Sequence, residues 1–256
     1  MYIKGTTTIT DKSGKPIIRE IYKRSCKPCV IEDGRIKTAK RSERQKPTPE
    51  AMRQYNAIVA QRRLIRKVNA NFTKGDLYLT LTYPRGSRPK PEEAKKDLTK
   101  FIAALRREFS RRNWELKWVA RTEIGAQGAI HHHVIVPKID TEVVERIWNR
   151  YGGGHAHFVS MYGRDFSLLA TYLCKPLPEN SEQMTLLPDD EIVTLNYRCS
   201  RNLYEPPEHK RTCRANSWRK DPVVPDGWYL DKESYIQGVN PITGRGYQYY
   251  RIIRLE

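Results

Sequence analysis

Two hydrophobic periods alternate between residues 77 and 162, one typical of half-buried strands and one typical of amphipathic helices. The strand-like segments are 77–83, 115–124, 129–136 and 155–162. Helical spacing of apolar residues occupies 91–112 and 140–150. The resulting order, βαββαβ, predicts an α+β, ferredoxin-like (split βαβ) antiparallel sheet with both helices on one face. In that topology the strand at 129–136 lies inside the sheet, and the strand at 155–162 lies at an edge.

The flanking regions have weaker patterns. A polar turn with Gly14 joins two strand-like runs, which predicts a hairpin over residues 2–23. Residues 31–47 are basic and lack apolar periodicity, so we expect an exposed connection. Thr48 is a suitable N-cap for a helix reaching about Asn69, with Ile58, Leu64, Ile65 and Val68 facing a core. The last eighty residues predict an irregular extension.

These patterns divide the chain into three predicted parts. Residues 1–70 form an N-terminal hairpin, basic linker and helix, residues 71–178 form the core domain, and residues 179–256 form a basic, aromatic C-terminal extension. A short helix at 165–175 closes the core domain.

Basic residues dominate the charge of this 256-residue chain. Lys and Arg number 47 against 29 Asp and Glu, giving a formal net charge of +18 and favouring a polyanionic partner, with nucleic acid as the first candidate. No apolar run is long enough to span a bilayer, and the N-terminal residues lack the apolar stretch of a signal peptide. We therefore expect a cytoplasmic protein that does not bind membranes.

Five cysteines, an odd number, argue against a framework of disulfides. Cys26 and Cys29 form a CxxC pair that, with His209 and Cys213, leaves a zinc site open. The long gap between the two halves is unlike a compact zinc module, so this site is the weaker hypothesis.

A run of three histidines supplies the main candidate for metal binding. Because side chains alternate along a strand, His131 and His133 share one face while His132 points to the other. Two imidazoles on one strand can bind a divalent ion together. Glu123, across a glycine-containing turn, becomes a third ligand only if a three-residue loop sets it opposite His131; loops of two or four residues turn it away.

Two further features accompany this cluster. His155 and His157 form a second HxH pair on the predicted edge strand, better suited to surface or phosphate contacts than to the main metal site. On the helix at 165–175, Tyr172 and Lys175 lie close together, as a nucleophile and a cation that stabilises phosphate charge would. With fifteen tyrosines in the chain, this spacing alone does not select Tyr172.

Basic and aromatic residues are candidates for contacts with nucleic acid, since cations follow a phosphate backbone while rings stack on bases. A solvated face and an aromatic-packed extension are the alternatives. The candidates are Arg62, Arg63, Arg66, Arg121, Arg198, Arg201, Lys210, Arg211 and Trp218.

Four segments together resemble the replication-associated (Rep) proteins of bacterial plasmids and phages, the family that includes the filamentous-phage replication endonuclease. They are NANFTKGDLYLTLTY, TEIGAQGAIHHHV, TYLCK and SRNLYEPP, within residues 48–207. Those proteins are HUH endonucleases, named for two histidines that flank a hydrophobic residue. The resemblance assigns the metal histidines to His131 and His133, the acidic ligand to Glu123, and the catalytic pair to Tyr172 and Lys175. His132 departs from the family pattern.

The resemblance implies a rolling-circle replication initiator that nicks one strand of a single-stranded or hairpin origin with Mg²⁺ or Mn²⁺. Tyr172 would bond to the 5′ phosphate, leaving a 3′ hydroxyl for a polymerase and permitting later religation. The sequence contains no phosphate-binding GxxxxGK[ST] motif, so a host helicase and polymerase are expected partners. A mobilisation relaxase or transposase with the same chemistry, and a non-catalytic module that binds single strands, remain alternatives.

Overall fold

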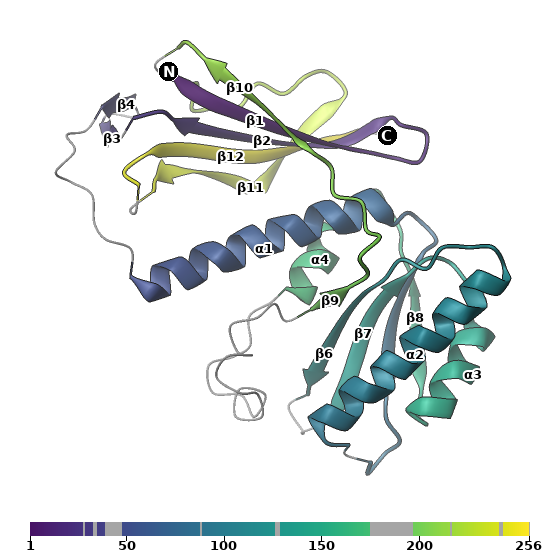
Figure 1. The fold of residues 1–256 in the computed structure, drawn as a ribbon. Helices are drawn as coiled ribbons and strands as arrows, with labels where there is room; N and C mark the ends of the chain where they lie inside the picture. Colours follow the sequence, from purple (N-terminus) through teal and green to yellow (C-terminus); the bar gives the residue numbers. More distant parts are fainter. Residues whose placement is uncertain are drawn as a thin grey trace. The chain divides into compact units, whose positions relative to one another are not determined.

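The computed structural model describes residues 1–27, 29–32, 35–38, 48–87, 89–125, 129–174, 197–215, 217–240 and 243–255. The chain divides into two compact units (Figure 1). The first unit combines both ends of the chain, Met1–Tyr55 and Glu205–Glu256, and the second unit is Asn56–Tyr204. This grouping differs from the three consecutive parts expected from the sequence.

The second unit contains the predicted βαββαβ order. Its elements are β5 (Leu77–Thr82), α2 (Pro91–Arg111), β6 (Val119–Ile124), β7 (Ile130–Val136), α3 (Thr141–Tyr151) and β8 (Ala156–Ser160). The antiparallel sheet has the order β8-β5-β7-β6-β9, where β9 (Arg198–Cys199) is a short strand that the sequence did not predict. The ferredoxin-like topology is therefore confirmed, with the histidine strand β7 inside the sheet.

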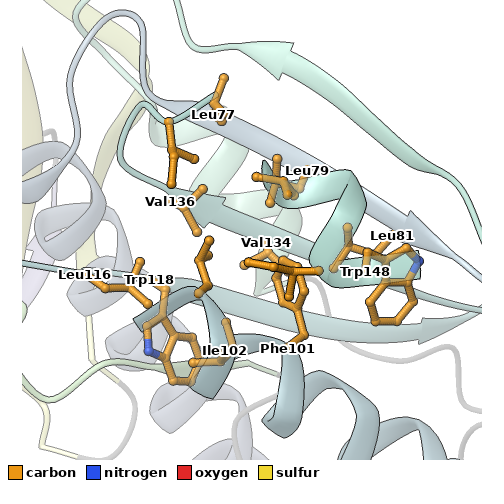
Figure 2. Packing of buried hydrophobic residues seen from close by; sticks show 14 of the residues in the cluster. Leu77, Leu79, Leu81, Phe101, Ile102, Leu116, Trp118, Val134, Val136 and Trp148 are labelled. Atoms are coloured by element: carbon orange, nitrogen blue, oxygen red, sulfur yellow. The ribbon is translucent and has the colours of Figure 1, made fainter. Parts of the chain in front are cut away.

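Helices α2 and α3 cover one face of this sheet, as predicted (Figure 2). The side chains that alternate toward them, such as Leu79 and Val134, are fully buried. They pack in one cluster with Phe101 of α2 and Trp148 of α3, whose rings meet edge to face at 5.8 Å. Burying this apolar face leaves the opposite face of the sheet to carry polar side chains.

The opposite face of the sheet contacts α1 (Pro49–Asn71) and α4 (Ser167–Leu173). Thr48 caps α1 as expected, with its Oγ1 accepting from Ala51 N at 3.1 Å. Leu64, Ile65 and Val68 are buried, but Ile58 is 46% exposed, so its predicted place in a core is wrong. Ile58 belongs to the part of α1 that precedes the buried residues of this helix.

The first unit is a second antiparallel sheet, in the order β10-β1-β2-β12-β11. The predicted N-terminal hairpin is confirmed as β1 (Tyr2–Thr10) and β2 (Pro16–Ser25). The other three strands are β10 (Glu208–Cys213), β11 (Trp228–Val239) and β12 (Gly246–Arg254). Strands from both ends of the chain therefore complete one sheet.

The prediction that the C-terminal region is irregular is wrong for these three strands. Buried polar side chains obscure the apolar alternation in β12: Gln248 is fully buried and Arg251 is 9% exposed. Gln248 accepts from Lys23 Nζ at 2.8 Å, and Arg251 pairs with Asp231. On the edge strand β10, every residue but Cys213 is exposed, which removes the alternation altogether.

The prediction of an exposed connection over 31–47 also needs correction in its first part. Backbone pairing joins β3 (Cys29–Glu32) and β4 (Arg35–Thr38) as a two-stranded sheet. Residues 39–47 lie outside the described part of the chain. Among the described helices, none has the length and apolar character needed to cross a membrane.

Candidate active site

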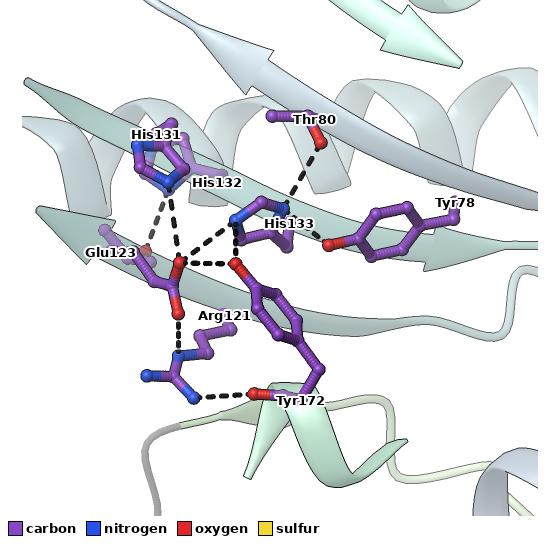
Figure 3. A network of polar contacts seen from close by, with 9 residues as sticks. Tyr78, Thr80, Arg121, Glu123, His131, His132, His133 and Tyr172 are labelled. Atoms are coloured by element: carbon purple, nitrogen blue, oxygen red, sulfur yellow. Dashed lines mark hydrogen bonds and ion pairs between the residues drawn. The ribbon is translucent and has the colours of Figure 1, made fainter. Parts of the chain in front are cut away.

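The face of the sheet opposite α2 and α3 carries a cluster of polar side chains (Figure 3). His131 and His133 both belong to this face because they are two residues apart on β7. Their rings meet edge to face with centroids 4.9 Å apart. His133 is buried and the side chain of His131 is 24% exposed, so the pair lies at the boundary between core and solvent.

The register of β6 and β7 places Glu123 opposite His131. The N–H of Gly125 donates to the carbonyl of Ala129 at 2.8 Å, which leaves residues 126–128 as a three-residue loop. This is the loop length that the sequence required for Glu123 to share the histidine face. Glu123 therefore reaches the histidines because of the turn length rather than its own local pattern.

Glu123, His131 and His133 could together hold a metal ion. One ligand atom from each residue lies within 4.8 Å of the others. Glu123 Oε2 is 3.5 Å from His131 Nε2 and 3.1 Å from His133 Nε2. These contacts, with the charge of nearby Arg121, hold the pKa of Glu123 well below its usual value, so the carboxyl is ionised and available as a ligand.

His132 points away from this cluster into the opposite core. Its ring is fully buried between Thr122, whose hydroxyl is 2.8 Å from Nδ1, and Tyr83, whose hydroxyl is 3.2 Å from Nε2. Burial lowers the pKa of His132 to about 3, so the imidazole is neutral. The side chain thus occupies a core position where the resembling family has a hydrophobic residue, and the register of His131 and His133 is unaffected.

Tyr78 and Thr80 of β5 lie beside His133 on the same face. The Tyr78 hydroxyl is 2.7 Å from His133 Nδ1, and Thr80 Oγ1 is 3.3 Å from the same nitrogen. A histidine that binds a metal through Nε2 carries its proton on Nδ1 and donates it to such a partner. The sequence analysis missed Tyr78, although its position in the alternating β5 pattern assigns it to the polar face.

Two groups fix α4 against the sheet so that Tyr172 points into the cluster. Asn69 of α1 is buried; its Oδ1 accepts from Phe166 N at 2.8 Å and its Nδ2 lies 3.3 Å from Ser167 Oγ. At the other end of α4, Arg121 Nη1 donates to the carbonyl of Tyr172 at 2.9 Å. The start and the end of this short helix are therefore both held by polar side chains.

The hydroxyl of Tyr172 donates to Glu123 Oε2 at 3.0 Å and lies 3.4 Å from His133 Nε2. Partial burial and the contact with Glu123 raise the pKa of Tyr172. Its ring remains 42% exposed, so a ligand on the solvent side can reach the phenol. Of the described tyrosines, Tyr172 is the one whose hydroxyl contacts the carboxylate of the candidate metal site.

Arg121 differs from its predicted role as a surface contact for nucleic acid. Its side chain is 3% exposed and pairs with Glu123 Oε1 at 2.8 Å. The same guanidinium reaches the backbone of Tyr172, so it joins a candidate metal ligand to the helix of the candidate nucleophile. In the sequence, Arg121 stands two residues before Glu123 on one strand, the spacing that assigns both to one face.

Several predicted site residues lie elsewhere. Lys175 falls outside the described residues. His155 and His157 are exposed on the edge strand side, with His157 paired to Thr80, and neither belongs to a group of described residues that could hold a metal. The side chain of Cys29 is likewise outside the described part, so the CxxC hypothesis stays a prediction.

The candidates for nucleic-acid contacts are divided between the two units. Arg62, Arg63, Arg66, Arg198 and Arg201 belong to the second unit, and Lys210, Arg211 and Trp218 to the first. Arg198, Arg201, Lys210 and Arg211 are exposed, whereas Trp218 is half-buried and packs edge to face on Tyr2 at 5.2 Å. Their contact with DNA stays a prediction.

Residues 76–177 match the family described as replication-associated protein ORF2. The matched segment runs from β5 to the end of α4 and includes Glu123, His131, His133 and Tyr172. No curated protein and no solved structure matches the chain. The resemblance to replication-associated proteins, noted in the sequence, is confirmed over these residues.

Proposed function

With residues 76–177 in a replication-associated family, we propose that this protein is a rolling-circle replication initiator of the HUH endonuclease type. It nicks one strand of a single-stranded or hairpin origin through a covalent bond to Tyr172. The observation that carries this proposal is the contact of the Tyr172 phenol with Glu123 and His133, 3.0 and 3.4 Å away. A nucleophile beside potential metal ligands is the arrangement that phosphoryl transfer requires.

A divalent ion fits the donor set of Glu123, His131 and His133. A bound ion would polarise the scissile phosphate and offset the negative charge of the transition state. Two imidazoles and one carboxylate suit Mn²⁺ better than Mg²⁺, which prefers oxygen ligands. We therefore expect tighter binding of Mn²⁺, with the native ion set by availability as well as affinity.

Each side chain of the cluster has a distinct role in the proposed reaction. Glu123 accepts from the Tyr172 phenol and so directs its oxygen toward the ligand-binding side. As the bond between Tyr172 Oη and phosphorus forms, the bond between phosphorus and the 3′ oxygen breaks. The proton lost by the phenol is balanced by the proton that the departing 3′ oxygen gains.

The covalent product keeps the energy of the phosphodiester bond, so attack by a 3′ hydroxyl reverses the reaction and religates the strand. Replication from the free 3′ end then requires a host polymerase and a helicase, which we propose as partners. Lys175, next to the described end of α4, is the proposed cation for the phosphate, as the resemblance implies.

A search for a covalent adduct tests this proposal directly. The full chain is incubated with a pool of labelled single strands of varied sequence and Mn²⁺ or Mg²⁺, then separated under denaturing conditions. We expect a labelled protein band with wild type and none with Tyr172→Phe. Tyr162→Phe is the matched control because Tyr162 is 80% exposed and outside the cluster.

Two results would overturn the proposal in different ways. Absence of an adduct with wild type and every strand in the pool rejects the nicking activity. An adduct of equal yield with Tyr172→Phe retains the activity but rejects Tyr172 as its nucleophile. Loss of the adduct in Tyr162→Phe as well would show that the assay reports folding rather than chemistry.

A further inference from the structure

A basic groove lies between α2 and α3, away from the face that carries Tyr172. Its volume is about 330 Å³, and its lining includes the apolar side chains of Ala104 and Ile147. Four arginines and one carboxylate supply its charged groups. These are Arg107, Glu108 and Arg111 of α2, and Arg146 and Arg150 of α3.

The arginines form two pairs at helical spacing, Arg107 with Arg111 and Arg146 with Arg150. Like charges four residues apart destabilise a helix by about 0.2–0.5 kcal/mol for each pair. Both pairs face the same groove, so the fold concentrates positive charge where repulsion between side chains opposes it. An anion bound in the groove would offset this repulsion.

Glu108 holds two of these arginines in place. Its Oε1 accepts from Arg111 Nη1 at 2.9 Å and pairs with Arg146 Nη2 at 3.4 Å, across the two helices. Arg107 and Arg150 form no ion pair with any described residue, and the Arg150 guanidinium lies over the ring of Tyr151 at 5.8 Å. The groove thus has an ordered centre and two guanidinium groups without a carboxylate partner.

The ligand that fits these groups carries phosphates. Guanidinium groups bind phosphate through two parallel hydrogen bonds, and several of them in a row suit a repeated anion. Since α2 and α3 cover the sheet face opposite His131 and Tyr172, a strand in this groove is not the strand at the candidate nucleophile. We propose that the groove binds the phosphate backbone of a second stretch of the origin DNA.

This inference rests on the proposed function, because a replication initiator supplies the reason for DNA to be present. It adds a second contact to that function. DNA held on both faces of the sheet would tie the nicked strand and a flanking duplex to one protein during the covalent stage.

The test compares two double variants of the full chain. Arg107→Gln/Arg150→Gln removes the two arginines that lack a carboxylate partner, and Gln preserves helix propensity. Arg106→Gln/Lys138→Gln is the control, because both residues are exposed, belong to the same unit and do not line the groove. Binding of a short labelled duplex is measured by fluorescence anisotropy over a range of salt concentrations.

We expect the groove variant to bind the duplex more weakly, with the slope of log affinity against log salt reduced by about 2, close to 0.9 for each lost phosphate contact. The control variant should keep a slope near wild type. The adduct with a short single strand should form equally in all three proteins.

The proposal fails if the groove variant binds the duplex as wild type does, or if the control loses as much slope. It also fails if the groove variant loses only the binding of a polyglutamate peptide, which would assign the groove to an acidic protein segment. Absence of the adduct in wild type would reject nicking, whereas a selective loss of duplex binding in the groove variant would still support the groove.

Discussion

The hydroxyl of Tyr172 and the Oε2 atom of Glu123 are 3.0 Å apart, although the two residues come from a short helix and a sheet strand 49 positions distant in the chain. The same Oε2 atom is the one nearest to both His131 and His133. Glu123 therefore links the candidate nucleophile to the candidate metal site, and most of the predictions below depend on this position.

Glu123→Gln should weaken the binding of Mn²⁺ by at least about 10–100-fold, since a neutral amide replaces the anionic ligand. Isothermal titration calorimetry on the full chain measures this affinity. Glu115→Gln removes an exposed carboxylate of the same unit and should bind Mn²⁺ as wild type does. Equal affinities for Glu123→Gln and wild type would remove Glu123 from the ligand set.

Tyr78→Phe should lower the affinity for Mn²⁺ by about 10–100-fold without removing a ligand, because the Tyr78 hydroxyl orients His133 through Nδ1. Tyr83→Phe is the matched control. It removes the phenol that contacts His132 on the opposite face, and should cost stability while leaving metal binding unchanged. If both variants bind Mn²⁺ equally well, orientation by Tyr78 is not needed.

Arg121→Lys should reduce the rate of adduct formation more than the affinity for metal. The lysine retains a charge for Glu123 but lacks the planar fork that also donates to the carbonyl of Tyr172. Single-turnover rates at saturating Mn²⁺ separate this effect from metal binding. A variant that binds Mn²⁺ poorly but reacts at the wild-type rate once saturated would contradict this role for Arg121.

Lys23 should make the first unit more stable as the pH rises from about 8 to about 10. Burial lowers the pKa of Lys23 to about 8, while the unfolded lysine keeps its ordinary value. Between these values the unfolded state binds more protons, so raising the pH favours the folded state by about 1–3 kcal/mol. Below the lower value, the cost of the buried charge is fully present.

Calorimetric melting across this pH range checks the Lys23 prediction. Lys23→Met should lose the rise in melting temperature that wild type has relative to it. Lys12→Met, which removes an exposed lysine of the same unit, should retain the rise. The comparison depends on the change with pH, because Lys23→Met also leaves Gln248 Oε1 without its donor.

Gly154→Ala should destabilise the second unit by at least about 1–3 kcal/mol, the usual cost of overpacking. A Cβ at Gly154 would lie 2.0 Å from the carbonyl oxygen of Thr82, which is backbone and cannot move aside cheaply. At Gly125 the nearest atoms to an added Cβ are 3.5 Å away, so Gly125→Ala should melt close to wild type. Equal melting temperatures for the two variants would contradict this packing argument.

Local periodicity sufficed for the βαββαβ order and for the shared face of His131 and His133. Both follow from the spacing of side chains along a strand or helix, which needs no knowledge of distant residues. The same rule placed His132 in the opposite core, where its neutral ring tolerates burial. The resemblance, rather than periodicity, singled out Tyr172 among fifteen tyrosines.

Only the tertiary structure decided the remaining features, because they depend on pairings between distant segments. The position of Glu123 depended on a three-residue loop, and that of Tyr172 on contacts from Asn69 and Arg121 at the two ends of α4. The sheet of the first unit joins strands more than two hundred residues apart. Its buried polar residues, Lys23 and Gln248, are stable there only because each finds the other, a match that neither segment contains by itself.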